Sequence, residues 1–460
     1  MPASATEVLP KTCIIGAGIT GLACAWEWKR RGGDCTILEQ SESSGGAIRS
    51  YRENGYLAEE GPHSILLNNG EIEKFLNSIP HLQSSVVESD PSAKKRFILR
   101  DRKLHAVPLS PLTAITTPLW SFRGKLRALK EPFIKAVSGD CEESIASFVR
   151  RRLGDELYRY AVNPMVAGIY AGDPETLSLK HTFPKLHALE QDHGGLLRGM
   201  IQTMKNARKS KGQKPTNRRI LSFKNGMAEL PEKLSSALSE SLHTAVVIDS
   251  ICKSDEGWNI TWSYSTGKTN KDTFDRLILT VPAWRLSNLP LDPELHEAFS
   301  CLETIDYPPV SVLSLGFKRN DVKHPLDGFG FLVPECENRQ ILGVLFPSSI
   351  FPKRAPAGEV LLAVFVGGAR QPKCATADTE ALKAMVLPEL KEILGVCGEP
   401  TFVHHRHWKK AIPQYTLGYG KQLEKMKQIE QDYPGLKLAG NYRTGVSVIA
   451  CIEAALDQTI

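Results

Sequence analysis

Three glycines and a glutamate near the N-terminus have the spacing of a site for a dinucleotide pyrophosphate. Gly16, Gly18 and Gly21 follow the apolar run 13–15, and Glu39 stands at the end of a second apolar run. The first glycine allows a tight turn, the second lets the backbone approach a pyrophosphate at the positive end of a helix, and the third lets helix and strand pack closely. A carboxylate at the position of Glu39 suits a ribose hydroxyl and disfavours a 2′-phosphate.

The elements that must position these residues form one short unit. Apolar patterning predicts a strand at 13–15, a helix at 21–30 and a second strand at 35–38, which together make a βαβ unit. Because the glycines have a strand before them, a helix after them and an acid at the right distance, the motif predicts dinucleotide binding. A glycine-rich turn in an ordinary α/β domain is the competing interpretation.

Two more glycine turns follow, and a third precedes the last helix. Gly45 and Gly46 come soon after the βαβ unit, and Gly61 comes after them, which indicates backbone passing close to a flat ligand. Arg49 between these turns suits a pyrophosphate charge; without the glycines it would be interpreted as a solvated arginine. Gly445 precedes a predicted helix at 449–458, whose N-terminus either faces the same ligand or simply docks on the fold.

Composition limits the possible classes of protein. With 460 residues, of which 42% are apolar, the chain has enough material for two or three globular domains. We find no run of 18 apolar residues and no signal-peptide pattern in residues 1–10, so we expect a cytosolic protein. The ten cysteines include no Cys-x-x-Cys pair and indicate reduced thiols. His404 and His405 would point to opposite faces of a strand, so we expect no metal site.

The positive charge is concentrated in one part of the chain. Residues 94–219 contain 25 Lys and Arg against 11 Asp and Glu, a net charge of +14, which leaves −8 for the rest. Helical periodicity at 121–137, 142–153, 155–166 and 177–208 predicts a mostly helical basic module. A linker is predicted at 209–217.

The segment 118–130 interleaves aromatic and leucine side chains with basic ones. Such a helix can lie at an anionic membrane surface with its apolar side inward. It can also be a core-packed helix with an ordinary basic face, or a surface that binds an acidic ligand. Nucleic acid is not expected, because no recognition module accompanies the charge.

The C-terminal half is predicted to be rich in strands. Runs at 245–251, 258–264 and 274–281 predict a small antiparallel extension whose last strand returns to the first sheet. Strands are also predicted at 310–317, 328–333, 341–346 and 359–366, in a mixed or antiparallel sheet, followed by a helix at 378–394 and a strand at 401–405.

Together these segments resemble the oxygen-dependent protoporphyrinogen oxidases of the flavin amine oxidase superfamily. The glycine turns and Glu39 are shared across that superfamily, whereas the stretches 163–178 and 411–415 are far more specific. Further similarity lies at 95–98, 107–108, 343–349 and 439–441.

The resemblance implies an α/β fold with three parts. A discontinuous, Rossmann-like FAD-binding domain would comprise 1–90, 216–295 and 405–460, and a mixed-sheet substrate domain would comprise 91–108 and 296–404. Residues 109–215 would form a basic helical domain of the membrane-binding type. A homodimer is expected from the resemblance alone.

The resemblance also implies a reaction and its site. The family oxidises a porphyrinogen to a porphyrin, removing six electrons in three flavin turnovers, with oxygen as acceptor and hydrogen peroxide as product. Arg96 is expected to pair with a propionate, Leu332 and Phe346 to line the faces of the macrocycle, and Gly168 to provide catalytic backbone near the pyrrole nitrogens. FAD contacts are expected at Gly16, Gly18, Thr20, Gly21, Glu39, Gly46, Arg49, Gly61, Pro62, Val247, Trp408, Gly440, Gly445 and Val446.

Each of these roles has a plain structural alternative. Arg96 could be one more solvated charge, Leu332 and Phe346 could belong to the core, and Gly168 could serve only a turn. The sequence also departs from the family pattern. His63 stands where the family commonly has asparagine or another residue, and the segment 442–445 replaces the more usual glycine pair.

Three other functions stay open. A coproporphyrinogen oxidase of the same fold would perform the same chemistry on a substrate with four carboxylates, although the motif at 95–98 favours protoporphyrinogen. An amine oxidase or carotenoid desaturase is more distant, since Asn441 stands where amine oxidases usually have glutamate. A non-catalytic protein that escorts a ligand is disfavoured by the intact glycines and Glu39.

Overall fold

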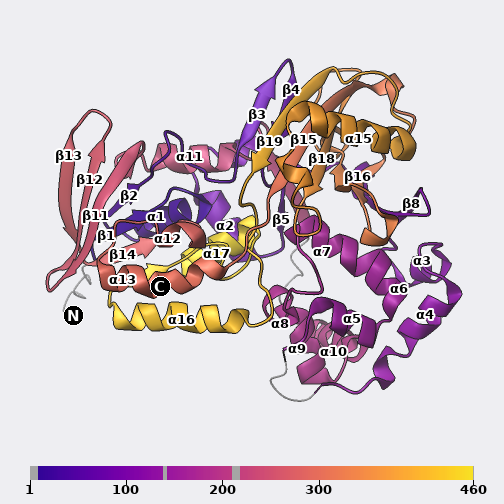
Figure 1. The fold of residues 1–460 in the computed structure, drawn as a ribbon, viewed down its shortest axis with the longest axis horizontal. Coiled ribbons are helices and arrows are strands. Elements are labelled where there is room, and N and C mark those ends of the chain that lie inside the picture. The colour runs from indigo at the N-terminus through magenta and orange to yellow at the C-terminus, as the bar shows by residue number, and fades with distance from the viewer. Residues whose placement is uncertain (1–8, 138–141, 210–217, 459–460) are drawn as a thin grey trace.

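The computed structural model describes residues 9–137, 142–209 and 218–458. Residues 1–8 of the N-terminal segment and residues 210–217 of the predicted linker lie outside this description. Figure 1 shows a small parallel sheet with its helices on the left, a larger sheet at the upper right, and a group of helices at the lower right. The expected α/β architecture with a mixed sheet and a helical part is confirmed.

The parallel sheet has five strands drawn from four distant parts of the chain. Its order is β10-β2-β1-β14-β20, and every neighbouring pair is parallel. The strands are β1 (Thr12–Ile15), β2 (Cys35–Leu38), β10 (Leu242–His243), β14 (Arg276–Leu279) and β20 (Leu436–Leu438). The predicted βαβ unit is confirmed, with α1 (Ile19–Arg30) between β1 and β2.

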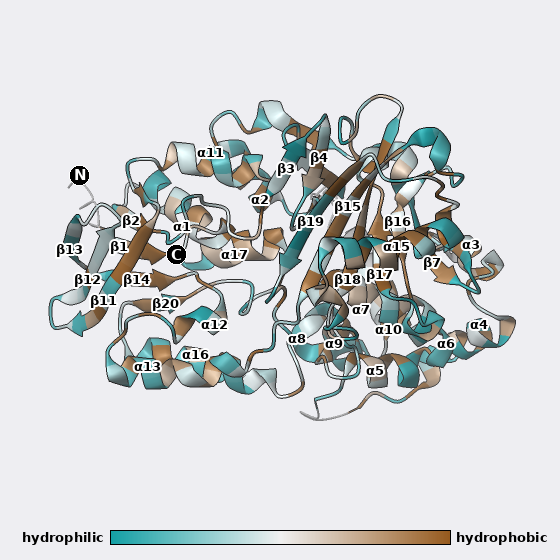
Figure 2. Cartoon of the chain, turned by 45° about the horizontal axis from the view of Figure 1, so that its top comes forward, coloured by the Kyte–Doolittle hydropathy of each residue, from teal (hydrophilic) through white to brown (hydrophobic). Residues whose placement is uncertain are grey.

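Helices α1, α11 (Glu229–Ala237) and α17 (Val448–Gln458) share one hydrophobic core with this sheet. On the opposite side lie α12 (Ala283–Leu286), α13 (Pro293–Ser300) and α16 (Tyr419–Asp432) (Figure 1). Helix α16 was not predicted from the sequence, because it is largely polar and buries only Tyr419, Met426 and Ile429. Strands β1 and β14 are among the most hydrophobic elements of this half (Figure 2).

Smaller elements complete this half. They are the hairpin β3 (Ser50–Glu53) and β4 (Tyr56–Glu59), the sheet of β5 (Ile65–Leu67), β9 (Arg219–Phe223) and β6 (Val86–Glu88), and α2 (Gly70–Ser78). An antiparallel sheet contains β11 (Val246–Ser254), β12 (Gly257–Tyr264) and β13 (Thr269–Phe274). The single strand predicted at 274–281 is divided at Asp275, because β13 stays in the antiparallel sheet while β14 enters the parallel one.

The larger sheet has seven strands in the order β19-β15-β18-β17-β16-β7-β8. They are β7 (Lys95–Arg100), β8 (Lys103–Ala106), β15 (Val310–Lys318), β16 (Gly328–Leu332), β17 (Ile341–Leu345), β18 (Glu359–Gly367) and β19 (Phe402–Trp408). Only the β16–β7 pair is parallel, so the predicted mixed sheet is confirmed. Strand β19 pairs with β15 as far as Trp408 and therefore crosses the domain boundary predicted at 404/405.

The two faces of this mixed sheet have different partners. Helix α15 (Thr379–Leu394) packs on one face against side chains such as Leu313, Phe331 and Val364. Helix α7 (Asn163–Tyr170) packs on the other face, where Ala167 and Ala171 meet Val310 and Val312. Because successive strand residues alternate between faces, the register decides which side chains reach α7.

The helical part confirms the predicted basic helical module, with shorter helices than expected. It contains α3 (Pro111–Thr116), α4 (Phe122–Leu129), α5 (Ile145–Arg152), α6 (Asp155–Leu157), a π-helical turn at Tyr158–Val162, α7, α8 (Leu179–Thr182), α9 (Pro184–His193) and α10 (Leu196–Lys209). The buried Arg152 pairs with Glu131 and Glu190, and Glu131 also accepts the first amides of α10. No helix of the described residues has the length and apolar character to span a membrane.

Candidate active site

The glycine turns predicted from the sequence meet in space. Gly18 caps α1 and forms a β-bridge with Gly45, whose amide donates to the Ala17 carbonyl at 2.8 Å. A Cβ on Gly46 would lie 3.3 Å from the Cα of Gly18, whereas a Cβ on Gly18 itself would meet nothing within 4 Å. The two turns therefore leave open space beside the N-terminus of α1, where a pyrophosphate would bind.

The third glycine of the motif has a packing role. A Cβ on Gly21 would lie 2.0 Å from the Gly16 carbonyl oxygen, so only glycine fits there. The hydroxyl of Thr280 donates to that same carbonyl at 2.8 Å. Thr280 follows β14 directly and was not singled out from the sequence. Its position at the carboxyl end of a parallel strand was the available signal, because ligands of such sheets bind at that edge.

Glu39 reaches the glycine turn from the end of β2. One carboxylate oxygen accepts the Ala17 amide at 2.7 Å and the other accepts the Ser41 amide at 2.8 Å. Since each carboxylate oxygen can accept two hydrogen bonds, Glu39 keeps acceptor capacity for a ribose hydroxyl. The amide of Val246 donates to the Glu39 carbonyl at 3.1 Å, which places the exposed Val247 beside this end of the sheet.

The glycine turns are contacted by three further expected residues, Arg49, Gly61 and Pro62. The Nε of Arg49 donates to the Gly46 carbonyl at 3.1 Å, and the Arg49 carbonyl accepts the Glu60 amide at 2.9 Å. A Cβ on Gly61 would lie 2.0 Å from the Ala47 carbonyl oxygen. Gly61 and Pro62 are half-buried. The guanidinium of Arg49 thus sits beside the open space at Gly18 and Gly46.

The C-terminal turn completes the same region. Gly440 and Gly445 both have φ near +150°, which favours glycine, and the half-buried Val446 follows. Thr20 is buried in the first turn of α1, next to Ile19, which shares one hydrophobic core with Val448 and Cys451 in the first turn of α17, so the N-termini of these helices are neighbours. The expected FAD residues from both ends of the chain are therefore close together, and the open cradle fits a dinucleotide.

Glu60 joins this region to the mixed sheet. Its carbonyl accepts the indole N–H of Trp408 at 2.7 Å, and its carboxylate lies 2.9 Å from Nε2 of His404. The bond from His404 holds the pKa of Glu60 below its usual range, with Arg406 contributing to the same effect. Trp408 thus lies at the junction between the glycine turns and β19.

The expected substrate residues divide into two groups. Leu332 of β16 and Gly168 of α7 are in contact, since a Cβ on Gly168 would lie 2.5 Å from Cδ2 of Leu332. Arg96 stands on the same sheet face, because Gly330 and Leu332 pair with Arg96 and Ile98 in parallel register.

Phe346 is not brought to this group. It is fully buried and contacts Phe331 and His324 on the α15 side of the sheet. Phe346 comes two residues after Val344, which also faces α15, so strand alternation directs it away from Leu332.

Arg96 combines exposure with an unpaired charge. Its guanidinium lies 5.0 Å from the centre of the Phe329 ring, and partial desolvation lowers its pKa. Neighbouring Lys95 is paired with Asp327, whereas Arg96 has no carboxylate partner among the described residues. Arg96 is therefore the side chain of this pair that is available to a carboxylate ligand.

A cross-strand row runs over the α7 side of the sheet. Register pairs link Ile98 to Leu332, Leu332 to Gly343, and Gly343 to Phe365. Adjacent strands are about 4.8 Å apart, so the span from Leu332 to Phe365 is about 10 Å. The ring of His63, which follows Gly61 and Pro62, lies 5.5 Å from the ring of Phe365. The row thus extends from α7 to the glycine-turn region.

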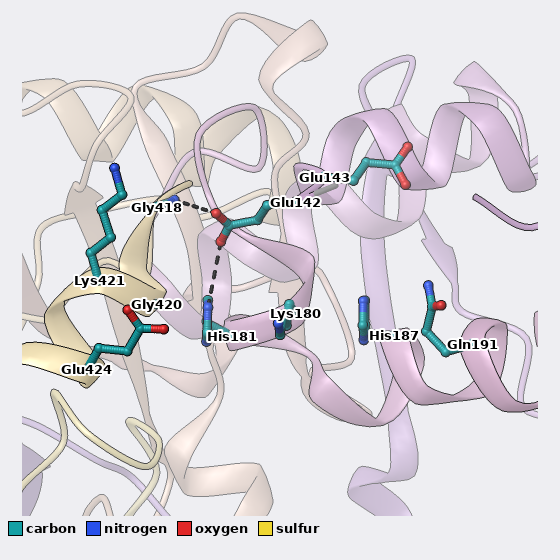
Figure 3. Close-up of a pocket in the computed structure, with 10 residues that line it drawn as sticks. All are labelled: Glu142, Glu143, Lys180, His181, His187, Gln191, Gly418, Gly420, Lys421 and Glu424. Carbon is teal, nitrogen blue, oxygen red and sulfur yellow. Dashed lines mark hydrogen bonds and ion pairs between the residues drawn. The ribbon is translucent and has the colours of Figure 1, made fainter. Parts of the chain in front are cut away.

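A separate polar pocket of about 650 Å³ lies between the helical part and α16. Figure 3 shows Glu142 between Gly418 and His181, with Lys421 and Glu424 projecting from α16 and with His187 and Gln191 farther along the helical part. Glu142 accepts the Gly418 amide at 2.6 Å. None of the expected site residues lines this pocket. Among the described residues, no three His, Cys, Asp or Glu side chains are arranged to hold a metal.

Comparisons with known proteins agree with this arrangement. The family model for flavin containing amine oxidoreductase matches residues 19–458. Protoporphyrinogen oxidase 2 of Arabidopsis thaliana is 33% identical over 95% of this chain and 91% of its own length. Coproporphyrinogen III oxidase of Bacillus subtilis is 28% identical over 96% of this chain and 95% of its own.

A solved structure is also similar over nearly the whole chain. It is a provisionally assigned protoporphyrinogen oxidase from Exiguobacterium sp. 255-15, with a TM-score of 0.79 and 26% identity. The alignment covers 98% of this chain and 97% of that one.

Proposed function

Because the chain belongs to the flavin containing amine oxidoreductases, we propose that it uses FAD to oxidise protoporphyrinogen IX to protoporphyrin IX. Oxygen is the proposed acceptor and hydrogen peroxide the second product. Family membership makes the chain a flavin-dependent oxidoreductase. The choice of a porphyrinogen is supported by relatives that match almost the full length of the chain and by the sheet face described above.

FAD, rather than a smaller flavin, is supported by the cradle. The open space beside Gly18 suits a pyrophosphate, Glu39 suits a ribose hydroxyl, and exposed Val247 offers backbone next to Glu39 for the adenine end. The flavin supplies the hydride acceptor when it is bound. We assign the nucleotide to the half that contains the parallel sheet and the substrate to the mixed-sheet face under α7.

The residues of the chain would act mainly by positioning. Leu332 and Phe365 provide apolar surface for the flat sides of a macrocycle, and Gly168 lets α7 approach that surface closely. Arg96 stands two residues from Ile98 along β7, about 7 Å farther out, where it would pair with a propionate. Since holding reactants in position lowers the barrier without acid–base chemistry, such a site is sufficient for hydride removal. Phe346 is left out of the proposed site because it faces α15.

The observation that carries this proposal is the meeting of the row from Leu332 to Phe365 with the segment that contains Gly61. It is tested by aerobic turnover of the purified protein with protoporphyrinogen IX and coproporphyrinogen III side by side. Porphyrin fluorescence and peroxide are followed against a reaction without enzyme. We expect porphyrin from the first substrate in clear preference; flavin bound with neither product would support the ligand-escort alternative.

Coproporphyrinogen III is the second candidate substrate. Its four carboxylates need more cationic partners than the two propionates of protoporphyrinogen IX. In this structure Lys95 is already paired with Asp327, which leaves Arg96 as the available partner at this point of the sheet. This difference favours protoporphyrinogen IX, and the side-by-side turnover measurement decides between the two.

We also propose that the helical part contacts an anionic membrane surface. Large apolar side chains are exposed in the helical part. Lys125 and Arg127 instead point inward, where they donate hydrogen bonds to backbone carbonyls. Lys125 ties α3 to α4 through the Ile115 carbonyl, and Glu131 ties the following turn to α10, so the exposed residues occupy connected elements. They are Leu109, Leu112, Ile115, Phe122, Leu126, Leu129, Phe133, Met200 and Ile201.

Vesicle flotation tests this contact. Phosphatidylcholine vesicles containing phosphatidylglycerol should retain the protein, and pure phosphatidylcholine should retain less, because basic residues add attraction to an anionic surface. The double variant F122E/L129E should reduce retention at least tenfold. L66E is the control, since Leu66 is an exposed apolar residue on β5, outside the helical part. Equal retention of both variants would contradict a specific contact.

A further inference from the structure

His63 is a buried side chain with one unused polar atom. Its relative exposure is 9%, and its Nε2 atom is buried without a hydrogen-bond partner among the described residues. The other ring nitrogen, Nδ1, lies 3.0 Å from the Gly61 carbonyl oxygen. Buried polar atoms are normally paired, so this unpaired one, on the sheet face that carries the row, indicates a missing partner.

The single contact of the ring determines what that partner must be. A carbonyl oxygen only accepts hydrogen bonds, so Nδ1 must carry the proton that is donated to Gly61. In a neutral imidazole the other nitrogen then carries a lone pair and no proton. Nε2 of His63 is therefore an acceptor, and its partner must be a donor.

The surroundings keep the ring neutral. Burial lowers the pKa of His63 to about 4, with a further contribution from Arg354, while the bond to Gly61 opposes the shift. Arg354 is itself buried beside Glu59 at 3.7 Å. The lone pair on Nε2 consequently persists at neutral pH.

The location of the ring indicates which ligand would provide the donor. His63 lies on the row side of the sheet, with its ring 5.5 Å from Phe365, and Phe365 pairs in register with Gly343 beside Leu332. A flat macrocycle lying along this row would present its central nitrogen atoms between Leu332 and Phe365. Pyrrole nitrogens carry N–H groups and provide the donor that Nε2 lacks.

We propose that Nε2 of His63 accepts a hydrogen bond from a pyrrole N–H of the tetrapyrrole and so fixes the rotation of the macrocycle on the sheet face. This inference rests on the proposed function and identifies the residue that orients the substrate.

The test uses protoporphyrin IX, which keeps pyrrole N–H groups and binds without turnover. Titration of the flavin-loaded protein is compared for wild type, H63F and H63Q. Phenylalanine keeps an aromatic ring but has no acceptor, so H63F should weaken porphyrin binding about tenfold. Glutamine provides an amide oxygen, so H63Q should stay within about threefold of wild type. H296F is the matched control, since His296 is exposed on α13.

A spectroscopic readout separates this role from a merely structural one. In protein labelled with ¹⁵N-histidine, the His63 Nε2 resonance should have the shift of an unprotonated nitrogen and should move when protoporphyrin IX is added. An unchanged resonance, or H63F that binds as tightly as wild type, would overturn the inference. A changed flavin spectrum in H63F with unchanged porphyrin binding would also overturn it, because His63 would then face the cofactor.

The two proposals fail in distinguishable ways. If wild type neither binds protoporphyrin IX nor oxidises the porphyrinogen, the proposed function is wrong. If wild type does both and H63F matches it, only the role of His63 is wrong.

Discussion

The two halves of the candidate site are built by different means. The glycine-turn region around Gly16 to Gly21 is shaped by backbone, because several positions have no room for a Cβ or leave open space where one would be. The row from Leu332 to Phe365 is shaped by side chains that strand register brings to one face. Substitution of a glycine should therefore disturb the glycine-turn region even when it adds a single methyl group. The row should instead respond to changes in the chemistry of individual side chains.

The largest expected effect comes from adding one methyl group to the backbone-built half. In G21A the new Cβ would lie 2.0 Å from the Gly16 carbonyl oxygen, and relief requires α1 to move from β1. We expect loss of about 3 kcal/mol of stability, by analogy with overpacked cores, together with loss of bound flavin. Thermal unfolding and flavin content after gel filtration measure both.

The matched variant is G18A. Gly18 has φ of −71°, which alanine adopts without strain, and its Cβ would meet nothing within 4 Å. This variant should fold with wild-type stability within about 1 kcal/mol but bind flavin at least tenfold more weakly, because the methyl occupies cofactor space. If G18A retains flavin as tightly as wild type, the open space is not the pyrophosphate site.

A second difference between the halves is a buried carboxyl in the backbone-built one. Glu59 accepts the Met227 amide at 2.9 Å, and burial raises its pKa to about 7. Because the folded pKa lies above the unfolded value of about 4.5, the folded protein binds more protons between pH 4.5 and 7. The contribution of Glu59 to the free energy of unfolding should therefore be largest below pH 4.5. It should fall by about 3 kcal/mol as the pH rises through 7.

The comparison of wild type with E59Q measures this dependence. The amide does not titrate, so E59Q should flatten the fall in unfolding free energy between pH 5 and pH 8. E42Q is the control, because Glu42 is exposed. A wild-type slope that E59Q leaves unchanged would assign the pH dependence to other groups.

In the side-chain-built half, the charge of Arg96 should contribute more to substrate binding than the charge of Lys95. R96A should raise the KM for protoporphyrinogen about tenfold, since a hydrogen-bonded charge pair with a propionate is worth about 1.5–3 kcal/mol before exposure reduces it. K95A should change KM less than twofold, because Lys95 is paired with Asp327. Both variants should keep wild-type flavin content. Equal effects of the two substitutions on KM would show that Arg96 contributes no more to substrate binding than its basic neighbours do.

The smallest expected effect is at the contact between α7 and the row. In G168A the new Cβ would lie 2.5 Å from Cδ2 of Leu332, the flexible end of a side chain. Rotation of Leu332 should absorb the contact, and the helix gains from alanine, so stability should change by less than about 1 kcal/mol. We expect KM to rise about threefold in G168A, since a displaced Leu332 narrows the site.

The double variant G168A/L332A tests that coupling. Removing the leucine side chain should abolish the effect of the added methyl on KM, so the two substitutions should be non-additive. Additive effects on KM would show that Gly168 acts independently of Leu332.

The difference between the halves also explains what could be predicted from the sequence. The glycine turn, Glu39 and the βαβ unit lie within one local stretch, and local spacing is enough to interpret them. The row depends on the pairing of β7 with β16, which are more than 200 residues apart, and no local pattern gives that register. Phe346 is an example. The sequence shows that residues of its strand alternate between two faces, but it does not show which face α15 covers.

Helix α16 and Thr280 were missed for related reasons. The polar surface of α16 hides a stripe of three buried residues, and Thr280 acquires its role only when β14 takes its place beside β1. The mixed sheet and the helical part were predicted correctly because apolar alternation and helical periodicity are local signals. Which residues from these elements meet at the site is a property of the tertiary structure.

The most direct test of the central claim is an anaerobic titration of the flavin-loaded protein with protoporphyrinogen IX. If the row presents the substrate to the cofactor, the oxidised flavin absorbance should bleach as each flavin takes two electrons from the substrate. Admitting oxygen should restore the flavin with release of peroxide, and repeated turnover should then complete the six-electron oxidation to porphyrin. Retention of the oxidised spectrum after excess protoporphyrinogen IX, in protein that demonstrably contains flavin, would contradict the claim.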